Sequence, residues 1–226
     1  MFELTATKVW RQAYPGAVAG GLVMNGVENP GRHPELDKRR VALEMQLRER
    51  YAGLSRKELK RVPPLDAYDA YYRSFGKSYH VQLQLESLVN ARRPIASPGA
   101  LVQAMFMAEL DTLVLTAGHD AAAVEGPVCV QVAEGTETFV RLDGKEQTLK
   151  AGDMFMADSV GVLSSVLHGP DSRTRITLET SAVFFAVYAP AGVGEEAVRV
   201  HLRAMEDLVR VVAPGAETEV LQLLEA

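Results

Sequence analysis

The chain has 226 residues, of which 47% are hydrophobic, and carries a net charge of −5. This length and apolar content suffice for one substantial hydrophobic core, or for one core with a small N-terminal appendage. No apolar run approaches the roughly 18 residues that a membrane-spanning helix needs, and the N-terminus lacks a signal-peptide pattern, so we expect a cytoplasmic protein without membrane contact.

The first quarter of the chain predicts a small unit of secondary structure. An apolar strand is expected over residues 17–24 and an amphipathic helix over residues 34–51. Ser55 and Glu58 have the spacing of a capping box and predict a brief further helix, which two consecutive prolines terminate. We therefore expect residues 1–62 to form an N-terminal strand and helix extension packed on the core.

The predicted helix lies within a basic segment. Residues 31–61 contain ten Lys or Arg against five Asp or Glu, so this segment carries about +5 while the rest of the chain carries about −10. One interpretation is a nucleic-acid-binding face, because neutralisation of phosphates supplies much of the affinity for nucleic acids. The other is a solvated helix with internal ion pairs, since Glu44 and Arg48 have the spacing that stabilises helices.

Three segments follow before the chain becomes mostly extended. Residues 65–75 have aromatic residues at helical spacing and predict a helix whose aromatic side chains lie in the core. Residues 80–90 fit either a strand or a helix. Ser97 is a natural N-cap with Pro98 at the first helical position, so a further helix is expected from residue 97 to 110.

From residue 112 onward, short apolar runs alternate with turn residues, which favours a mixed α+β domain. Asp143-Gly144 predicts a type I′ hairpin turn. Residues 160–167 predict an apolar strand that carries Ser164 and Ser165 on opposite faces. Two amphipathic helices are expected at the C-terminus, over residues 195–212 and 216–224, packed against the core or against a second subunit in a homodimer.

Several common chemistries have no support in the sequence. The five histidines show no HxxxH or HExxH spacing. One cysteine is too few for a thiolate zinc site, and we interpret this single cysteine, Cys129, as a core residue. There is no GxSxG elbow, no Walker loop and no GxGxxG. We therefore expect neither a metal nor a cofactor. A small β-barrel that holds a ligand is an alternative suggested by the turn-rich stretch at residues 152–174.

Three stretches of sequence carry a resemblance to a known family. The first is LDGKE at residues 142–146, which precedes an apolar strand and a glycine; the second is RPI at residues 93–95 with the helix that follows; the third is Gly118-His119-Asp120. Together these resemble the B3/B4 editing domain of the bacterial phenylalanyl-tRNA synthetase beta chain, over residues 68–190.

The resemblance implies an α+β fold with a B3/B4-like mixed β-sheet core and flanking helices. It favours a helix for residues 80–90, and it divides the rest of the chain into an editing-like domain at residues 63–190 and C-terminal helices at residues 191–226. No synthetase catalytic core is apparent, so the relatives implied are stand-alone B3/B4 proteins, some of which act as trans-editing deacylases.

The implied activity is hydrolysis of the ester between a mischarged amino acid and its tRNA. The partner would be the acceptor end of that tRNA, not DNA. Water is the nucleophile, and the site has to align it on the carbonyl and support the developing oxyanion. A second, differently shaped pocket is needed because a synthetase alone cannot reject a near-isostere strongly. A non-catalytic module that binds tRNA or an amino acid is the alternative.

The resemblance also implies roles for individual residues. Glu146 would hold the ammonium group or a polar side chain of the amino acid, and His119 would orient water or bind the terminal adenosine, although the family histidine aligns two residues earlier. Ser164 and Ser165 would line the pocket wall and complete the catalytic set. The expected substrate-binding residues are Arg73, Asn90, Arg93, Thr116 and Gly118.

The sequence leaves two candidates for the mischarged amino acid, which we call the cargo. The helix that carries polar residues in the synthetases here shows Leu101, Gln103 and Ala104, so tyrosine on phenylalanine tRNA is not assured. Extra hydroxyls at Ser164 and Ser165 favour a polar amino acid, because a buried hydroxyl without a partner costs roughly 1 to 3 kcal/mol. The two candidates are an aromatic analogue on phenylalanine tRNA and a polar analogue such as canavanine on arginine tRNA.

Overall fold

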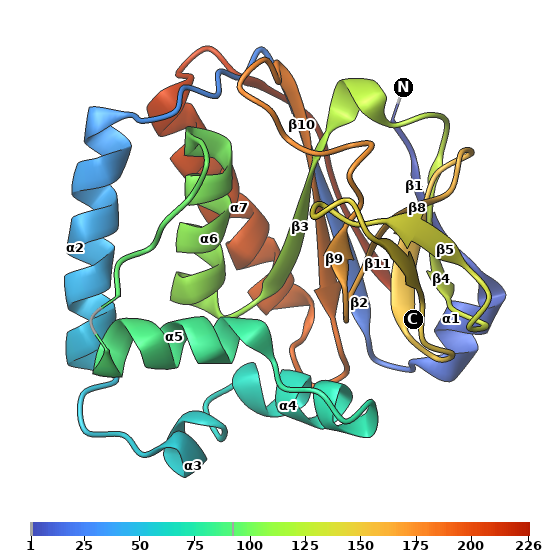
Figure 1. Cartoon of the computed structure of the whole chain (residues 1–226), viewed down its shortest axis with the longest axis horizontal. Coiled ribbons are helices and arrows are strands. Elements are labelled where there is room, and N and C mark those ends of the chain that lie inside the picture. The colour runs from blue at the N-terminus through green and yellow to red at the C-terminus, as the bar shows by residue number, and fades with distance from the viewer. Residues whose placement is uncertain (1, 92) are drawn as a thin grey trace.

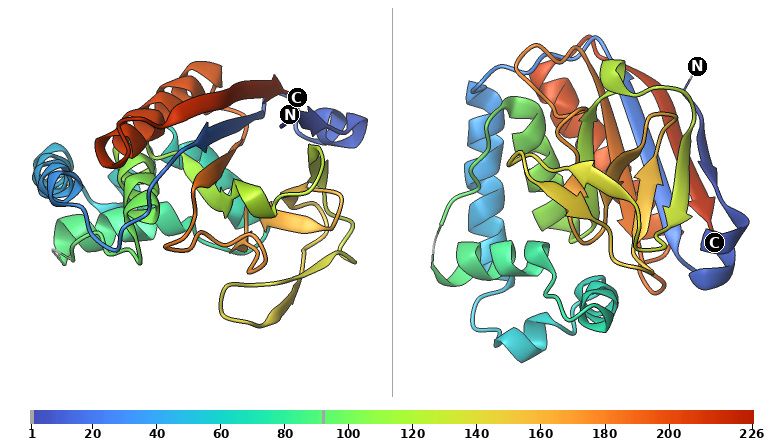
Figure 2. Two further views of the ribbon diagram at one scale, coloured as in Figure 1. Left: turned by 90° about the horizontal axis from the view of Figure 1, so that it is seen from above. Right: turned by 45° about the vertical axis from the view of Figure 1, so that its right-hand side comes forward.

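The computed structural model describes residues 2–91 and 93–226, which form a mixed α+β fold of three layers (Figure 1). Helices cover one face of a four-stranded sheet, and a five-stranded sheet packs on its other face (Figure 2). The four-stranded sheet has the order β11-β2-β10-β3 and contains β2 (Val18–Asn25), β3 (Leu115–Asp120), β10 (Ala182–Ala189) and β11 (Glu217–Glu225).

The five-stranded sheet and a separate hairpin form the third layer. The sheet has the order β1-β4-β7-β8-β9 and contains β1 (Leu4–Ala6), β4 (Val128–Val132), β7 (Met154–Ala157), β8 (Val162–Ser165) and β9 (Gly169–Pro170). The hairpin pairs β5 (Thr138–Val140) with β6 (Glu146–Thr148). Both larger sheets are open and end in edge strands, so the fold is not the closed β-barrel of the alternative prediction.

The helices fall into two groups. Those that cover the four-stranded sheet are α6 (Ala100–Thr112) and α7 (Glu195–Val212), with α2 (Pro34–Arg50) packed on their outer side. Those that connect or flank these layers are α1 (Lys8–Ala13), α3 (Arg56–Leu59), α4 (Leu65–Ser74), α5 (His80–Asn90) and the short 3-10 turn at Ala121–Ala123.

The strand β10 explains how the layers are joined. Its side chains alternate between the two faces of the sheet, as the period of a strand requires. Phe184 and Tyr188 belong to the core shared with the five-stranded sheet, whereas Phe185 and Val187 belong to the core beneath the helices. All four are buried. A strand that is apolar on both faces is therefore the central element of two hydrophobic cores.

The helix α7 lies close against the sheet because β2 carries a glycine at the contact. A Cβ atom at Gly20 would lie 2.9 Å from Val198 Cγ1 and 3.2 Å from Leu202 Cδ1. Val198, Leu202, Met205 and Val209 are spaced by three or four residues and are fully buried, so they form the apolar stripe of this helix.

Aromatic side chains hold α4 against the sheets, as predicted from their helical spacing. The rings of Tyr68 and Tyr79 stack with their centroids 4.3 Å apart. The Tyr68 hydroxyl donates to the Tyr188 carbonyl oxygen at 2.6 Å and accepts from the Leu115 amide at 2.9 Å. Tyr68 therefore connects α4 to both β10 and β3.

Two local predictions were wrong in detail. The helix α6 begins at Ala100 with Gly99 as its cap, not at Ser97, because the side chain of Asn29 accepts from the Leu101 amide at 2.9 Å and caps the helix from another part of the chain. The hairpin turn is not type I′, since Gly144 has a φ of 79° whereas Asp143 is not among the positive-φ residues of the described chain. Hydrogen bonds from Gly144 to Arg141 and from Arg141 to Lys145 define a three-residue loop instead.

The helix predicted over residues 216–224 is the strand β11, which pairs antiparallel with β2. Its apolar residues face both cores, with Val220 and Leu224 on one side and Leu221 and Leu223 on the other. A short run that is apolar on both faces does not distinguish a helix from a strand by periodicity. The sheet thus contains strands from all three predicted segments of the chain, whose boundaries at 62 and 190 stay predictions.

Candidate functional site

A cavity of about 480 Å³ lies beside α6, where β3 and β9 come together. These are edge strands of the two larger sheets, so the cavity is a gap between the sheet edges. Most of its lining is apolar, from α6 (Val102, Met105, Phe106), β3 (Leu115, Ala117), the hairpin loop (Leu142) and Ile176. The polar lining residues are Thr116, Ser165, Glu109, His80, Arg175 and Tyr188.

Three of the residues predicted for the site line this cavity: Thr116, Gly118 and Ser165. Gly118 leaves room that any side chain would fill, because a Cβ atom there would lie 2.8 Å from Ile176 Cδ1 and 3.1 Å from Met105 Sδ. The absence of a side chain at this position therefore keeps the cavity open.

At the free edge of β3, alternate backbone amides point away from the neighbouring strand β10. The amide of Thr116 donates to Glu109 Oε1 at 2.7 Å, and the amide of Asp120 donates to the Thr174 carbonyl oxygen at 2.7 Å. Both point away from β10, and outward amides alternate along an antiparallel edge. The amide of Gly118, midway between them, therefore points outward at the same edge, and Gly118 itself lines the cavity.

Glu109 is a cavity residue that the sequence reasoning missed. It is only 1% exposed, and Oε2 has no hydrogen-bond partner among the described residues. Burial raises the pKa of this carboxyl group to about 8, against the smaller opposing effect of the Thr116 amide. The signal in the sequence is a lone carboxylate within the apolar run MFMAEL, which is an unusual place for a charge.

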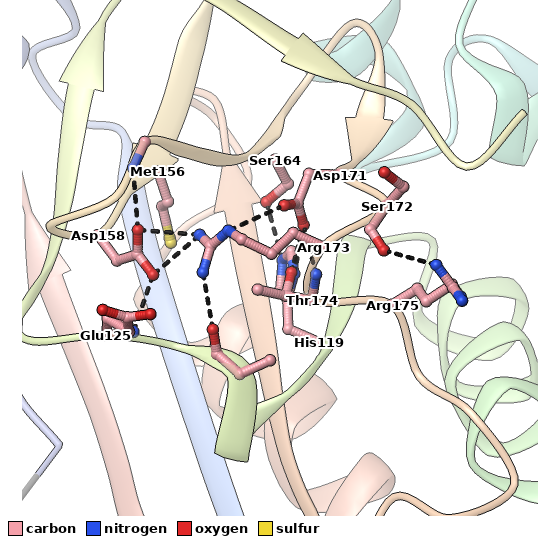
Figure 3. A network of polar contacts seen from close by, with 12 residues as sticks. His119, Glu125, Met156, Asp158, Ser164, Asp171, Ser172, Arg173, Thr174 and Arg175 are labelled. Carbon is pink, nitrogen blue, oxygen red and sulfur yellow. Dashed lines mark hydrogen bonds and ion pairs between the residues drawn. The ribbon is translucent and has the colours of Figure 1, made fainter. Parts of the chain in front are cut away.

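His119 and Ser164 meet each other, but outside the cavity (Figure 3). His119 Nε2 lies 3.1 Å from Ser164 Oγ, and His119 Nδ1 lies 2.7 Å from Thr174 Oγ1. Ser164 Oγ also lies 2.7 Å from the Tyr188 hydroxyl. Both His119 and Ser164 are 0% exposed. Burial lowers the pKa of His119 to about 3, so the imidazole is neutral at physiological pH.

A partly exposed ion-pair cluster continues from this network. Thr174 Oγ1 donates to Asp171, and Arg173 bonds Asp158 through both carboxylate oxygens at 2.9 Å (Figure 3). Arg173 also lies 3.6 Å from Asp171 and donates to the Ala123 carbonyl oxygen at 2.7 Å. These contacts fix residues 171–174, which lead directly into the cavity residues Arg175 and Ile176.

The other predicted site residues do not reach the cavity. Glu146 is exposed on β6, although the loop of the same hairpin brings Leu142 to the cavity. Arg73 is exposed on α4 and pairs with Asp69 at 3.2 Å. Asn90 is exposed at the end of α5, and Arg93 lines a separate hollow of about 220 Å³.

The helix residues that we expected to bear on cargo specificity also lie outside the cavity lining. Leu101 and Ala104 are buried in the core beneath α7, and Gln103 donates to Asp37 at 3.3 Å. The face of α6 that lines the cavity instead carries Val102, Met105, Phe106 and Glu109. Of the two serines, only Ser165 lines the cavity. One hydroxyl, and not the expected two, therefore adds polarity to the cavity wall.

Positive charge gathers near the cavity. Arg175 is exposed at its lining and donates to the Ser172 carbonyl oxygen at 3.1 Å. The pKa of His168 is lowered by burial and then by the nearby cations Lys77, Arg141 and Lys150. His168 lies between the cavity residues Ser165 and Gly169 in the chain.

Most of the positive charge of the basic segment at residues 31–61 is taken up by ion pairs. Seven of its ten cations form ion pairs, which favours the interpretation as a helix with internal and neighbouring salt bridges. These seven are Arg32, Lys38, Arg40, Arg48, Arg50, Arg56 and Lys60.

Neither a membrane-spanning helix nor a metal-binding cluster occurs among the described residues. None of their helices combines the length and the apolar character that crossing a membrane requires. Within the same part of the chain, no three His, Cys, Asp or Glu side chains gather in a way that would hold a metal ion.

Comparison with known proteins gives consistent results. A family model described as the B3/4 domain matches residues 91–208, just over half of the chain. The phenylalanine–tRNA ligase beta subunit of Mycoplasma pneumoniae is 36% identical over 69 residues, which are 30% of this chain and 9% of that protein. The same subunit of Tropheryma whipplei is 37% identical over 67 residues, which are 29% of this chain and 7% of that protein.

A solved structure extends the likeness to the whole chain. The crystal structure of an N-terminal fragment of the phenylalanyl-tRNA synthetase beta subunit from Pyrococcus horikoshii covers 100% of this chain and 55% of that one, with a TM-score of 0.51 and 16% identity. This match shows a shared fold. The chain spans less than a tenth of the curated relatives' length, so their whole activity does not transfer with the match.

Proposed function

The chain belongs to the B3/4 domain family, and from this premise we propose that it is a trans-acting deacylase that hydrolyses mischarged aminoacyl-tRNA. The cavity between β3 and β9 would hold the amino acid and the ester bond. Its volume of about 480 Å³ lies within the range of small-molecule sites, roughly 300 to 1,000 Å³.

The observation that carries this proposal is the outward amide of Gly118. Ester hydrolysis develops negative charge on the carbonyl oxygen, and a fixed backbone N–H in a site shielded from water stabilises that charge. Because Gly118 has no side chain, the carbonyl can approach its amide closely. Ser165, at the cavity wall, has a hydroxyl that accepts from the His168 amide at 3.2 Å and would hold the attacking water.

The chemical step requires no covalent intermediate with the protein. Water adds to the ester carbonyl carbon, the tetrahedral intermediate loses its bond to the ribose oxygen, and a proton passes to that oxygen. The products are the free amino acid and uncharged tRNA. Positioning of the water and stabilisation of the oxyanion would supply the acceleration.

Arg175 at the cavity lining and the three cations near His168 would suit a tRNA end. Arg175, Lys77, Arg141 and Lys150 would contact phosphates of the acceptor strand. Each phosphate that is neutralised adds about 0.7 to 0.9 to the slope of log affinity against log salt. The affinity for tRNA should therefore fall steeply with salt.

The remaining predicted residues would act less directly. His119 and Ser164 would position β8 and the segment that leads to Arg175, since their side chains are sealed from the cavity. For Glu146 to contact the ammonium group, the hairpin would have to move over the cavity. Glu146→Ala tests this role: a loss of turnover with retained tRNA binding supports it.

The experiment that tests the proposal is release of amino acid from a panel of charged tRNAs. The panel contains phenylalanine, tyrosine and meta-tyrosine on phenylalanine tRNA, and arginine and canavanine on arginine tRNA. Rapid hydrolysis of one mischarged species, with its correct counterpart spared, would support deacylation.

A second candidate is a non-catalytic module that binds tRNA or an amino acid. The observation that favours it is the position of His119, which is 0% exposed and therefore closed to a substrate. Salt-sensitive tRNA binding without hydrolysis of any member of the panel would support this candidate over the enzyme.

A further inference from the structure

Asp153 is a buried carboxylate that has no part in the mechanism described so far. It immediately precedes β7 and is 0% exposed. The Tyr71 hydroxyl donates to its Oδ1 at 2.7 Å, and the Leu167 amide donates to its Oδ2 at 3.3 Å. These partners are a hydroxyl and an amide rather than cations. Because a carboxylate held away from water is costly, a position that keeps one is a candidate for a functional role.

The hydroxyl of Ser165 connects Asp153 to the cavity. Ser165 lines the cavity from β8, and β8 pairs with the strand β7 that Asp153 precedes. Ser165 Oγ accepts from the His168 amide at 3.2 Å, and its own proton is donated to Asp153. A hydroxyl oxygen has two lone pairs, so one remains to accept a hydrogen bond from a molecule in the cavity.

We propose that Asp153 is a positioning residue for the attacking water, and that it takes up, through the Ser165 hydroxyl, the proton which that water loses. This inference rests on the proposed deacylase function. The water oxygen bonds to the ester carbonyl carbon while a water proton passes to Ser165 Oγ and the Ser165 proton passes to Asp153. When the bond to the ribose oxygen breaks, one proton returns along the same path to that oxygen. Ser165 and Asp153 are then as they were at the start.

Tyr71 fixes the direction of the hydrogen bonds around Asp153. Its hydroxyl accepts from the Met154 amide at 2.7 Å, so its own proton is available only to the carboxylate. Tyr71 and the Leu167 amide thus hold one carboxylate oxygen each. A carboxylate fixed in this way is an acceptor toward Ser165 as well, which keeps the free lone pair of Ser165 available to the cavity.

The charge of Asp153 changes within a pH range that an assay can reach. Burial raises the pKa of Asp153 to about 6, against the lowering effect of hydrogen bonds from Tyr71 and Ser165. The carboxyl group is therefore an acid below about pH 6 and an available base above it. The titratable groups that face it are tyrosine hydroxyls, and burial raises the pKa of each, so they stay uncharged. They are Tyr14, Tyr71, Tyr72 and Tyr188.

The test is the pH profile of single-turnover deacylation from about pH 5 to about pH 7, with the rate of hydrolysis without protein subtracted. The substrate is the mischarged tRNA that the wild type hydrolyses fastest. We expect the wild-type rate to fall several-fold toward low pH with a midpoint near pH 6, because a protonated Asp153 takes up no further proton. The two other titratable groups of the cavity lie outside this range, since burial raises the pKa of Glu109 to about 8 and lowers that of His80 to about 4.

Four variants identify the group that titrates. Asp153→Asn keeps the shape of the side chain and should show the low rate at every pH, and Ser165→Ala should do the same. The double variant should be no slower than either single variant, because both changes interrupt one path. Tyr71→Phe removes a donor to the carboxylate, so the midpoint should move to higher pH. Asp66→Asn changes an exposed carboxylate on α4 and is the matched control, with rate and midpoint unchanged.

The outcomes separate this inference from the proposed function. A wild-type profile without a midpoint in this range, a midpoint that persists in Asp153→Asn or Ser165→Ala, or an unmoved midpoint in Tyr71→Phe overturns the role of Asp153 and leaves the deacylase standing. Losses that multiply in the double variant do the same. Where Asp153→Asn does not fold, the profiles of Ser165→Ala and Tyr71→Phe decide. If the wild type hydrolyses no charged tRNA, the proposed function fails and this inference fails with it.

Discussion

Two polar regions lie side by side in this molecule and differ in how their hydrogen bonds are satisfied. Around His119, both ring nitrogens and the hydroxyls of Ser164 and Thr174 have partners within the protein, and the imidazole is fully buried. At the edge of β3, Glu109 Oε2 lacks a partner in the described chain, and Gly118 lines a cavity with its amide at the outer edge of the strand.

The first region is sealed within the protein, whereas the second borders the cavity. A fully satisfied polar network fixes the surrounding backbone, whereas unpaired groups at a cavity are available to bind. The serine and histidine that resemble a catalytic pair therefore belong to the sealed region. The less conspicuous Gly118 and Glu109 line the cavity, although the Glu109 side chain itself is only 1% exposed.

The largest expected effect follows from His119→Ala. This change leaves the hydroxyls of Ser164 and Thr174 without their imidazole partner and creates a void, so we expect a loss of about 3 to 4 kcal/mol in the free energy of unfolding. Urea unfolding measures it. Unchanged stability together with abolished turnover would instead make His119 a catalytic residue.

Gly118→Ala should affect activity more than stability. The added Cβ would lie 2.8 Å from Ile176 Cδ1 within the cavity, so we expect the kcat/KM for the preferred mischarged tRNA to fall about 10- to 100-fold. Gly215→Ala is the matched control, because a Cβ there meets nothing within 4 Å. Equal activity in the two variants would remove Gly118 from the site.

Glu109→Gln should change how stability depends on pH. The pKa of Glu109 is raised to about 8 in the native state, against about 4.3 in an unfolded chain. Between these values the native state keeps a proton that the unfolded state has lost, so wild-type stability falls as pH rises, by up to ~1.4 kcal/mol per pH unit from this group.

The variant lacks this group and should gain stability relative to the wild type from about pH 5 to pH 8. Urea unfolding at several pH values, with Glu146→Gln as the exposed control, measures the difference. Parallel curves for the wild type and Glu109→Gln would show that Glu109 is ionised in the native protein.

The smallest effects separate the two adjacent serines. Ser164→Ala should cost about 1 to 2 kcal/mol of stability and leave KM unchanged, because its hydroxyl bonds only buried groups. Ser165→Ala should lower kcat several-fold with less effect on stability, since Ser165 lines the cavity. Unfolding and single-turnover deacylation of both variants measure these effects, and reversed outcomes would exchange their roles.

The sequence predicted most of the fold because its strongest signals are local. The capping box of Ser55 and Glu58 and the aromatic spacing on α4 are properties of neighbouring residues, and both are confirmed. Residues 216–224 were predicted as a helix because the choice between helix and strand there depends on pairing with β2, far away in the chain.

The candidate site was harder to predict for the same reason. Thr116, Gly118 and Ser165 came from the resemblance, and the structure brings all three to one cavity. Whether a serine faces a cavity or a sealed network depends on strand orientation, which no local pattern fixes. Glu109 was missed because its burial arises only when α6 packs beside β3.

The most direct test of the account is a crystal structure of the protein with a non-hydrolysable tyrosyl-adenosine analogue. We predict that the aminoacyl group lies in the cavity beside α6 and that its carbonyl oxygen accepts a hydrogen bond from the Gly118 amide. An analogue bound instead at Glu146 or against His119 and Ser164, with the cavity at β3 empty, would contradict the account.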